Sequence, residues 1–200
     1  MRKPRPAALV PLLLAGIALA HPDGTRAGQP GDASWLDRPL RSWNRGGAVD
    51  RARVIDEERS ALADRCHQPV LQASPAERAL TEAGWLAFHV GGGPLVSGDL
   101  EIVGGMTAAD GMCRPLQYNL FVFVGGRFAG TLSPVLMDAR ADGASGAVRI
   151  AGGAIRVDFS RYRGDDPLCC PSAHVEVRYR VDRTAGAAVV VPVELRATRG

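Results

Sequence analysis

The stretch 174–182 reads HVEVRYRVD, and its alternation decides the fold class. Its apolar positions are Val175, Val177, Tyr179 and Val181, and a charged residue follows each of them. Because successive side chains of an extended chain point to opposite faces, one face of this strand lies on a core and the other lies in water. This pattern is typical of an antiparallel sheet with one covered face.

The strand pattern recurs along the chain after residue 84. The further segments are 85–90, 100–104, 116–124, 127–132, 147–151, 154–160 and 188–196. Two of the links between them are glycine pairs, Gly125-Gly126 and Gly152-Gly153, which predict tight hairpins because the favoured turns need positive φ. Pro192 indicates a bulge or a sheet edge, whereas the apolar run 189–191 before it indicates a covered, central strand. The sequence leaves this conflict open.

Two helices are predicted before the strands. One covers residues 51–65 and has Asp50 as its N-cap. The other begins where Ser74 and Glu77 form a capping box around Pro75, and it ends at Gly84. We therefore predict one α+β domain over residues 50–200, a mostly antiparallel β-sheet with the two N-terminal helices packed on it.

Residues 1–20 have the pattern of a secretory signal peptide. A basic start at Arg2, Lys3 and Arg5 precedes an apolar run, and Ala18-Leu19-Ala20 supplies the small residues that a signal peptidase reads. The run is too short and too interrupted for a good membrane span. We expect cleavage before His21 and a periplasmic or secreted protein.

Removing the leader changes the charge of the chain. The leader holds three of the 24 bases and none of the 21 acids, so 21 of each remain. The basic pI therefore gives no support for a nucleic acid or membrane partner. Lys3 is the only lysine, which excludes a P-loop lysine and a Schiff base from the mature chain.

Residues 21–49 differ in composition from the rest of the chain. The segment is rich in Gly, Pro, Asp and Arg and has little periodic apolar pattern, which favours a flexible N-terminal segment. Trp35 and Trp43 are unusual in such a segment. They dock either on the domain itself, which we favour, or on a partner.

The four cysteines, Cys66, Cys113, Cys169 and Cys170, carry the strongest chemical signal. An even number in an exported chain indicates disulfides, so we expect a stapled domain with all four oxidised. A bond between the neighbours Cys169 and Cys170 closes a strained small ring, and we rank it last. We prefer Cys66–Cys169 with Cys113–Cys170, slightly over the crossed alternative.

The catalytic and metal-binding templates that we compared do not fit. There is no Cys-x-x-Cys, and His67 is the only histidine near a cysteine in sequence, so we expect no metal site and no cofactor. Residues 143–147 lack the final glycine of a nucleophile elbow. His89 and His174 lie in strand patterns, where a lone histidine is more often a surface or core residue than a catalyst. We therefore name no catalytic residue.

Three segments together resemble a known family. They read FVFVGGRFAGTLSP at 121–134, MDARADG at 137–143 and YRGDDPLCCPS at 162–172. They resemble the LppP/LprE-like family of bacterial exported lipoproteins, and the resemblance covers residues 80–195. This family is largely of unknown function, so the resemblance implies a compartment and a fold unit, and no reaction. Lipoproteins need a cysteine just after the leader, and none precedes Cys66, so we expect a released protein without a membrane anchor.

The leading hypothesis is an exported, non-enzymatic binding or envelope-associated module with an unknown envelope partner or ligand. The alternative is a hydrolase-like envelope enzyme with an unrecognised site. A pocket holding His89 or His174 with an acid and Ser133 would favour the enzyme. An exposed apolar or aromatic patch without such a cluster would favour binding.

Overall fold

The computed structural model describes residues 34–184 and 186–198 of the chain. The expected signal peptide, residues 1–20, lies outside the described residues, as does the stretch 21–33.

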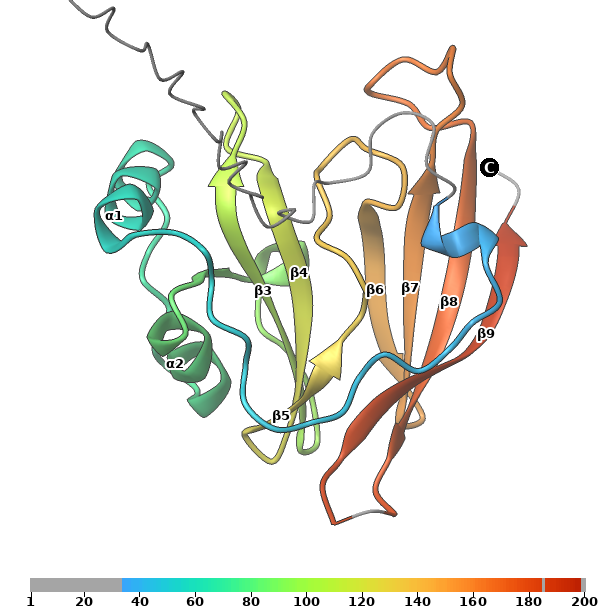
Figure 1. Ribbon diagram of the computed structural model, residues 1–200, viewed down its shortest axis with the longest axis horizontal. Helices are drawn as coiled ribbons and strands as arrows, with labels where there is room; N and C mark the ends of the chain where they lie inside the picture. The colour runs from blue at the N-terminus through green and yellow to red at the C-terminus, as the bar shows by residue number, and fades with distance from the viewer. Residues whose placement is uncertain (1–33, 185, 199–200) are drawn as a thin grey trace, which may run out of the picture.

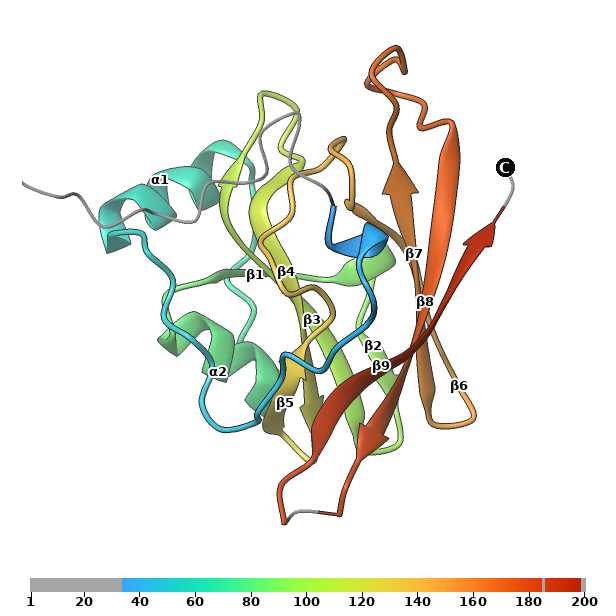
Figure 2. The same cartoon turned by 45° about the vertical axis from the view of Figure 1, so that its right-hand side comes forward.

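Two antiparallel sheets and two α-helices form three layers. The first sheet has the order β1-β3-β4-β5, with β2 paired to β3, and the second has the order β6-β7-β8-β9. The strands of the first sheet are β1 (Leu86–Phe88), β2 (Leu95–Ser97), β3 (Leu100–Ala109), β4 (Pro115–Val124) and β5 (Arg127–Thr131). Those of the second are β6 (Ser145–Ala151), β7 (Ala154–Arg161), β8 (Ala173–Asp182) and β9 (Val189–Thr198). The helices α1 (Asp56–Arg65) and α2 (Pro75–Glu82) cover one side of the first sheet, and the second sheet covers the other (Figures 1 and 2). The predicted α+β class is confirmed, with the strands divided between two sheets.

The layers explain the two kinds of strand pattern. In β4, residues 118–124 are all buried, because the helices pack on one face of the first sheet and the second sheet packs on the other. In β8 the buried positions alternate, because only its inner face is covered. The inner face of the second sheet contributes Val157, Val177 and Tyr179 to the core, all without exposed surface. Burial of such side chains contributes about 1.5–3 kcal/mol each.

Both predicted glycine hairpins are present. Gly125 and Gly126 link β4 to β5 with φ of 57° and 74°, and Gly152 and Gly153 link β6 to β7 with φ of 56° and 72°. Positive φ at both central residues is the requirement of the tightest hairpin turn, and glycine meets it without steric cost.

The structure resolves the conflict over Pro192. Strand β9 is the edge of its sheet, and its register shifts where Arg178 pairs with Glu194 but Tyr179 pairs with Pro192. Pro192 therefore stands both on an edge strand and beside a bulge, the two places where a strand tolerates proline. The run before it is covered even so, since Val190 is fully buried.

One helix starts as predicted and the other does not. In α2 the Ser74 side chain accepts from Glu77 N and the Glu77 carboxylate accepts from Ser74 N, which confirms the capping box. Helix α1 begins at Asp56 after Ile55, so the prediction of a start near residue 51 with Asp50 as its cap was wrong. The chain stays extended there because Ala52 N donates to Ala83 O at 2.8 Å and Trp85 Nε1 donates to Asp50 O at 2.8 Å.

Residues 34–53, which we call the strap, cross the molecule from the second sheet to the helices (Figure 1). The strap includes the described part of the segment expected to be flexible, and it carries both tryptophans. Trp35 packs edge-on against Phe159 at 5.2 Å between centroids, and Trp43 packs against Tyr179 at 6.3 Å. The interpretation that the tryptophans dock on their own domain is confirmed.

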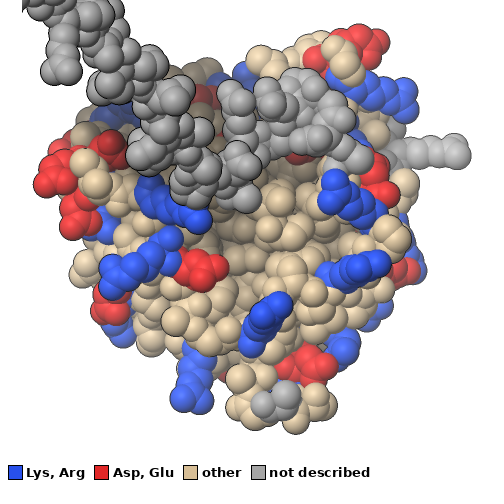
Figure 3. Space-filling model, viewed as in Figure 1, with Lys and Arg blue, Asp and Glu red and all other residues tan. Residues whose placement is uncertain are grey.

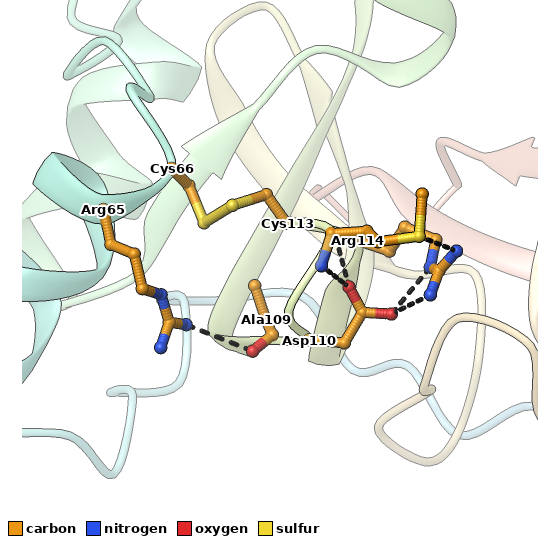
Figure 4. Close-up of a disulfide and its surroundings, with 7 residues drawn as sticks. Arg65, Cys66, Ala109, Asp110, Cys113 and Arg114 are labelled. Atoms are coloured by element: carbon orange, nitrogen blue, oxygen red, sulfur yellow. Dashed lines mark hydrogen bonds and ion pairs between the residues drawn. A yellow bond between two sulfur atoms is a disulfide. The ribbon is translucent and has the colours of Figure 1, made fainter.

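All four cysteines are paired, but the predicted connectivity was wrong. Cys66 bonds to Cys113 with a Cα–Cα distance of 5.5 Å, and Cys169 bonds to its neighbour Cys170. Cys66 caps the end of α1 beside the β3–β4 hairpin, where Arg65 also donates to Ala109 O at 3.2 Å (Figure 4). The other two cysteines lie in the β7–β8 loop of the second sheet, on the far side of β4, so neither of the preferred long-range bonds forms.

Candidate functional site

A cleft of about 430 Å³ opens at one end of the two sheets, where β4 and β6 begin and β7 ends. We call it the end cleft. Its lining is Phe88, Val90, Gly91, Arg114, Pro115, Tyr118, Leu120, Ala139, Arg140, Ala144, Ser145, Gly146, Ser160, Tyr162, Cys169, Pro171 and His174. These residues come from both sheets and from the loops that join their ends. A smaller hollow of about 160 Å³ lies between α1, α2 and β1.

An aromatic wall forms the side of the end cleft nearer the first sheet. Phe88 and Tyr118 meet edge-to-face at 6.0 Å between centroids. Tyr118 Oη accepts from Ser145 N at 2.9 Å and lies 3.1 Å from Ser145 Oγ, which ties β4 to the start of β6. Burial raises the pKa of the Tyr118 phenol, so the ring stays neutral at physiological pH. The wall is therefore apolar and fixed in place.

The turn from 137 to 144 fixes the base of the end cleft to both sheets. On the side of β4, Ala139 N donates to Pro115 O at 2.9 Å and Asp138 Oδ1 accepts from Gln117 N at 2.7 Å. On the side of β7, Ser160 N donates to Ala144 O at 2.9 Å. This turn is therefore hydrogen-bonded to one strand of each sheet.

Arg140 lies on this turn and lines the end cleft. Its φ is 66°, in a region that L-residues rarely adopt and that occurs most often in turns and functional sites. Its side chain is exposed and makes no ion pair within residues 34–184 and 186–198. Arg114, by contrast, is held by Asp110, with Nε 2.6 Å from Oδ2 (Figure 4).

The arginines of the lining give it a positive charge. Arg114 and Arg140 line the end cleft, and none of the described residues that line it is a carboxylate. The guanidinium groups are planar forks that bind carboxylate, sulfate or phosphate oxygens in pairs. An aromatic wall together with an unpaired cation suits a small anionic ligand that has an apolar or ring-shaped body.

Residues 162–172, which we call the rim loop, close the opposite side. Tyr162 Oη donates to Leu168 O at 3.1 Å, and Cys170 N donates to Pro167 O at 2.8 Å. Asp166 accepts from Arg163 N at 2.8 Å and from Ser172 N at 2.9 Å, and these amides lower the pKa of its carboxyl. The Cys169–Cys170 bond lies within this loop, with Cys169 facing the end cleft.

The residues named as marks of an enzyme are not brought together. His89 Nε2 lies 2.8 Å from Glu77 Oε1, and Ser133 is fully buried with its hydroxyl donating to Val135 O at 2.7 Å. His174 alone of the three lines the end cleft.

The Glu77–His89 pair belongs to the capping box of α2. Burial would raise the pKa of Glu77, but hydrogen bonds from His89 and from the amides of Ser74 and Ala73 hold it below its ordinary value. Within the described residues there is also no group of three His, Cys, Asp or Glu side chains that could hold a metal ion.

The sequence did not point to Arg140, Tyr118 or Tyr162 as site residues. They come from a turn, a strand and a loop, and only the packing of the two sheets brings them together. One usable signal was the concentration of the family-like segments at 137–143 and 162–172, both of which contact the end cleft.

The fold and the end cleft define an α+β domain of two stacked sheets with an open site at one end. Residues 98–184 match the family model described as LppP/LprE lipoprotein, so this part of the chain is similar to that family. The match runs from the approach to β3 through β8 and includes most of the lining of the end cleft. No curated protein and no solved structure matches the chain. None of the helices in the described part is both long and apolar enough to cross a membrane.

Proposed function

We propose that this protein is an exported, non-enzymatic binding module of the cell envelope, and that the end cleft is its ligand site. One observation carries the proposal: a cleft of about 430 Å³ whose described lining has aromatic side chains and two arginines and no carboxylate. Clefts of this size commonly hold small molecules. The hydrogen-bonded walls favour affinity, because a site that is already ordered loses little entropy on binding.

The ligand class follows from the lining. The anionic group contacts Arg140, and the body of the ligand lies against Phe88 and Tyr118. Charge-assisted hydrogen bonds are worth about 1.5–3 kcal/mol, which makes Arg140 the largest polar contribution.

Binding is favoured over hydrolysis by the composition of the site. Ser160 and His174 are cross-strand neighbours in the end cleft, but within residues 34–184 and 186–198 the lining has no carboxylate that orients the imidazole. A serine nucleophile needs a base that a third group holds in place.

Export is supported by the basic and apolar leader pattern, the disulfides and the family. We place the mature protein in the periplasm or outside the cell, released rather than anchored in a membrane, with an envelope molecule and not nucleic acid as its partner. N-terminal sequencing of the protein from envelope and culture fractions should give a chain that begins at His21. A chain that begins at Met1 or carries lipid contradicts this part of the proposal.

The binding site is tested with anilinonaphthalene sulfonate, an anionic aromatic probe whose fluorescence rises on transfer from water. We expect saturable binding to the folded protein and a loss of affinity of about tenfold in Arg140→Gln. The matched control is Arg127→Gln, an exposed arginine of the β4–β5 turn at the opposite end of the sheet, which should leave binding unchanged. Equal losses in the two variants, or no saturable binding to the native protein, would refute the assignment.

A further inference from the structure

The strap forms a second site, distinct from the end cleft. We propose that its outward-facing arginines bind a linear polyanion, a phosphate- or carboxylate-bearing polymer of the envelope. Four observations carry this inference: the fixed backbone of the strap, its exposed and unpaired arginines, their succession along one segment of the chain, and the acidic boundary at its end.

The inner side of the strap holds its backbone in place. Trp43 Nε1 donates to Thr131 O at 3.2 Å. The Asn44 side chain joins the sheets: its Nδ2 donates to Thr131 O and to Val190 O, each at 2.9 Å, and its Oδ1 accepts from Thr131 N at 2.8 Å. Gly130 allows this approach, because a Cβ there would collide with the Asn44 amide.

The outer side of the strap is basic. Arg41, Arg45, Arg51 and Arg53 are all exposed, and Asp50 is the only acid among residues 38–53. In the described part of the chain these four side chains have no ion pair and no hydrogen bond. Figure 3 shows basic side chains spread over this face of the molecule, with few acidic ones between them.

This row differs from the paired arginines on the second sheet. On the outer face of the second sheet, Arg149 and Arg156 pair with Glu176 across the strands. Arginines paired in this way are largely neutralised by their neighbours. The strap arginines are left available to a partner from outside the chain.

The arrangement fits a linear partner better than a flat one. An extended chain rises about 3.3 Å per residue, so Arg41 and Arg45 lie at most about 13 Å apart along the backbone. Gly46 and Gly47, with φ of 68° and 108°, bend the strap after them, and the four arginines follow one another along its curved path (Figure 1). A linear polymer reaches all four cations in series, and weak contacts in series add through effective concentration. A bilayer surface would call for a two-dimensional patch.

Acidic side chains mark the end of the row of strap arginines. Helix α1 begins directly after the strap with Asp56, Glu57 and Glu58 in its first turn, where acidic side chains also suit the helix dipole. These carboxylates repel a polyanion and confine it to residues 41–53.

Binding of long-chain polyphosphate to the purified, oxidised protein tests the inference, with calorimetry as the measurement. We expect binding that weakens as salt rises, and a loss of affinity of at least about tenfold when Arg41, Arg45, Arg51 and Arg53 are all changed to Gln. The control changes Arg127, Arg178, Arg180 and Arg196 to Gln, which removes the same formal charge from other exposed positions. Two of these arginines are unpaired in the described part of the chain, and the other two pair with Asp182 and Glu194. This control should keep the affinity within about threefold of the native value, since only long-range charge is lost.

Two further ligands distinguish a linear polyanion from a single small anion and from a membrane surface. Inorganic phosphate should bind at least about tenfold more weakly than polyphosphate, because a single anion cannot use the row. Vesicles of phosphatidylglycerol should bind more weakly than polyphosphate at equal accessible phosphate. Equal losses in the two quadruple variants, tighter binding to vesicles, or no binding of polyphosphate would each overturn the inference. Thermal unfolding of both variants, expected to match the native protein because the side chains are exposed, confirms that they fold.

Discussion

The two disulfides differ in what they connect and therefore in what they contribute to the molecule. Cys66–Cys113 joins the end of α1 to the β3–β4 hairpin across a sequence separation of 47, whereas Cys169–Cys170 joins neighbours inside the rim loop. A bond that closes a long loop restricts the unfolded chain and so stabilises the native state. A bond between neighbours closes no loop of that kind. The first is therefore part of the fold, and the second shapes the edge of the end cleft.

The largest effect is expected from removing the long-range bond. Replacing Cys66 and Cys113 together by Ala should lower the free energy of unfolding by about 4 kcal/mol in the chain-entropy model, a large share of the stability of a domain. Denaturant unfolding of the oxidised proteins measures it. A loss below about 1 kcal/mol would remove the distinction between the two bonds.

A smaller loss is expected at Gly104, in the strand next to the long-range bond. A Cβ at Gly104 would collide with the ring of Phe88, so Gly104→Ala should cost about 1–3 kcal/mol through overpacking. The matched position is Gly164 in the rim loop, where a Cβ would meet nothing within 4 Å. Gly164→Ala should leave the unfolding midpoint nearly unchanged, and equal costs at the two glycines would show that the rim loop is as tightly packed as β3.

Removing the Cys169–Cys170 bond should weaken ligand binding while leaving the free energy of unfolding nearly unchanged. Replacing Cys169 and Cys170 by Ala should change the free energy of unfolding by less than about 0.5 kcal/mol, as for exposed positions in general. The same variant should bind anilinonaphthalene sulfonate several-fold more weakly, because Cys169 lines the end cleft and the loop around it is less ordered. A large loss of stability with unchanged binding would reverse the roles given to the two disulfides.

The smallest effect is a pH dependence confined to the rim loop. The pKa of Asp166 is lowered in the folded state, so its contribution is fully present above the unfolded pKa near 4 and is lost as the pH falls from there through the lower folded-state pKa. Amide exchange at Arg163 and Ser172 should therefore rise, relative to the intrinsic rate, as the pH is lowered from about 5 to 3, while exchange in β3 stays slow. Asp166→Asn should remove this pH dependence, and a parallel change in β3 would mean that the loop and the sheet open together.

The parts of the fold predicted from sequence are those set by local rules. The alternation at 174–182, the glycine pairs and the capping box at Ser74 each need only a few residues, and each is present in the structure. Strand β2 was not predicted because its three residues have no period of their own and pair only with β3.

The missed features depend on contacts between distant segments. The cysteine pairing required knowing that α1 ends beside the β3–β4 hairpin, and the sequence gives no distance between them. The end cleft has the same origin, since Arg140 and Tyr162 meet only after the two sheets stack. Residue types indicated chemistry here, but only the arrangement of the sheets created a site.

The most direct test of the central claim is to map where an anionic aromatic molecule binds. Amide chemical shifts of the native protein, recorded during a titration with anilinonaphthalene sulfonate, report this position residue by residue. The account predicts that the largest changes fall on Tyr118, Arg140, Ser145 and Tyr162 around the end cleft, and that they are much reduced in Arg140→Gln. Changes centred on the smaller hollow between α1 and α2, or scattered over the surface without saturation, would contradict it.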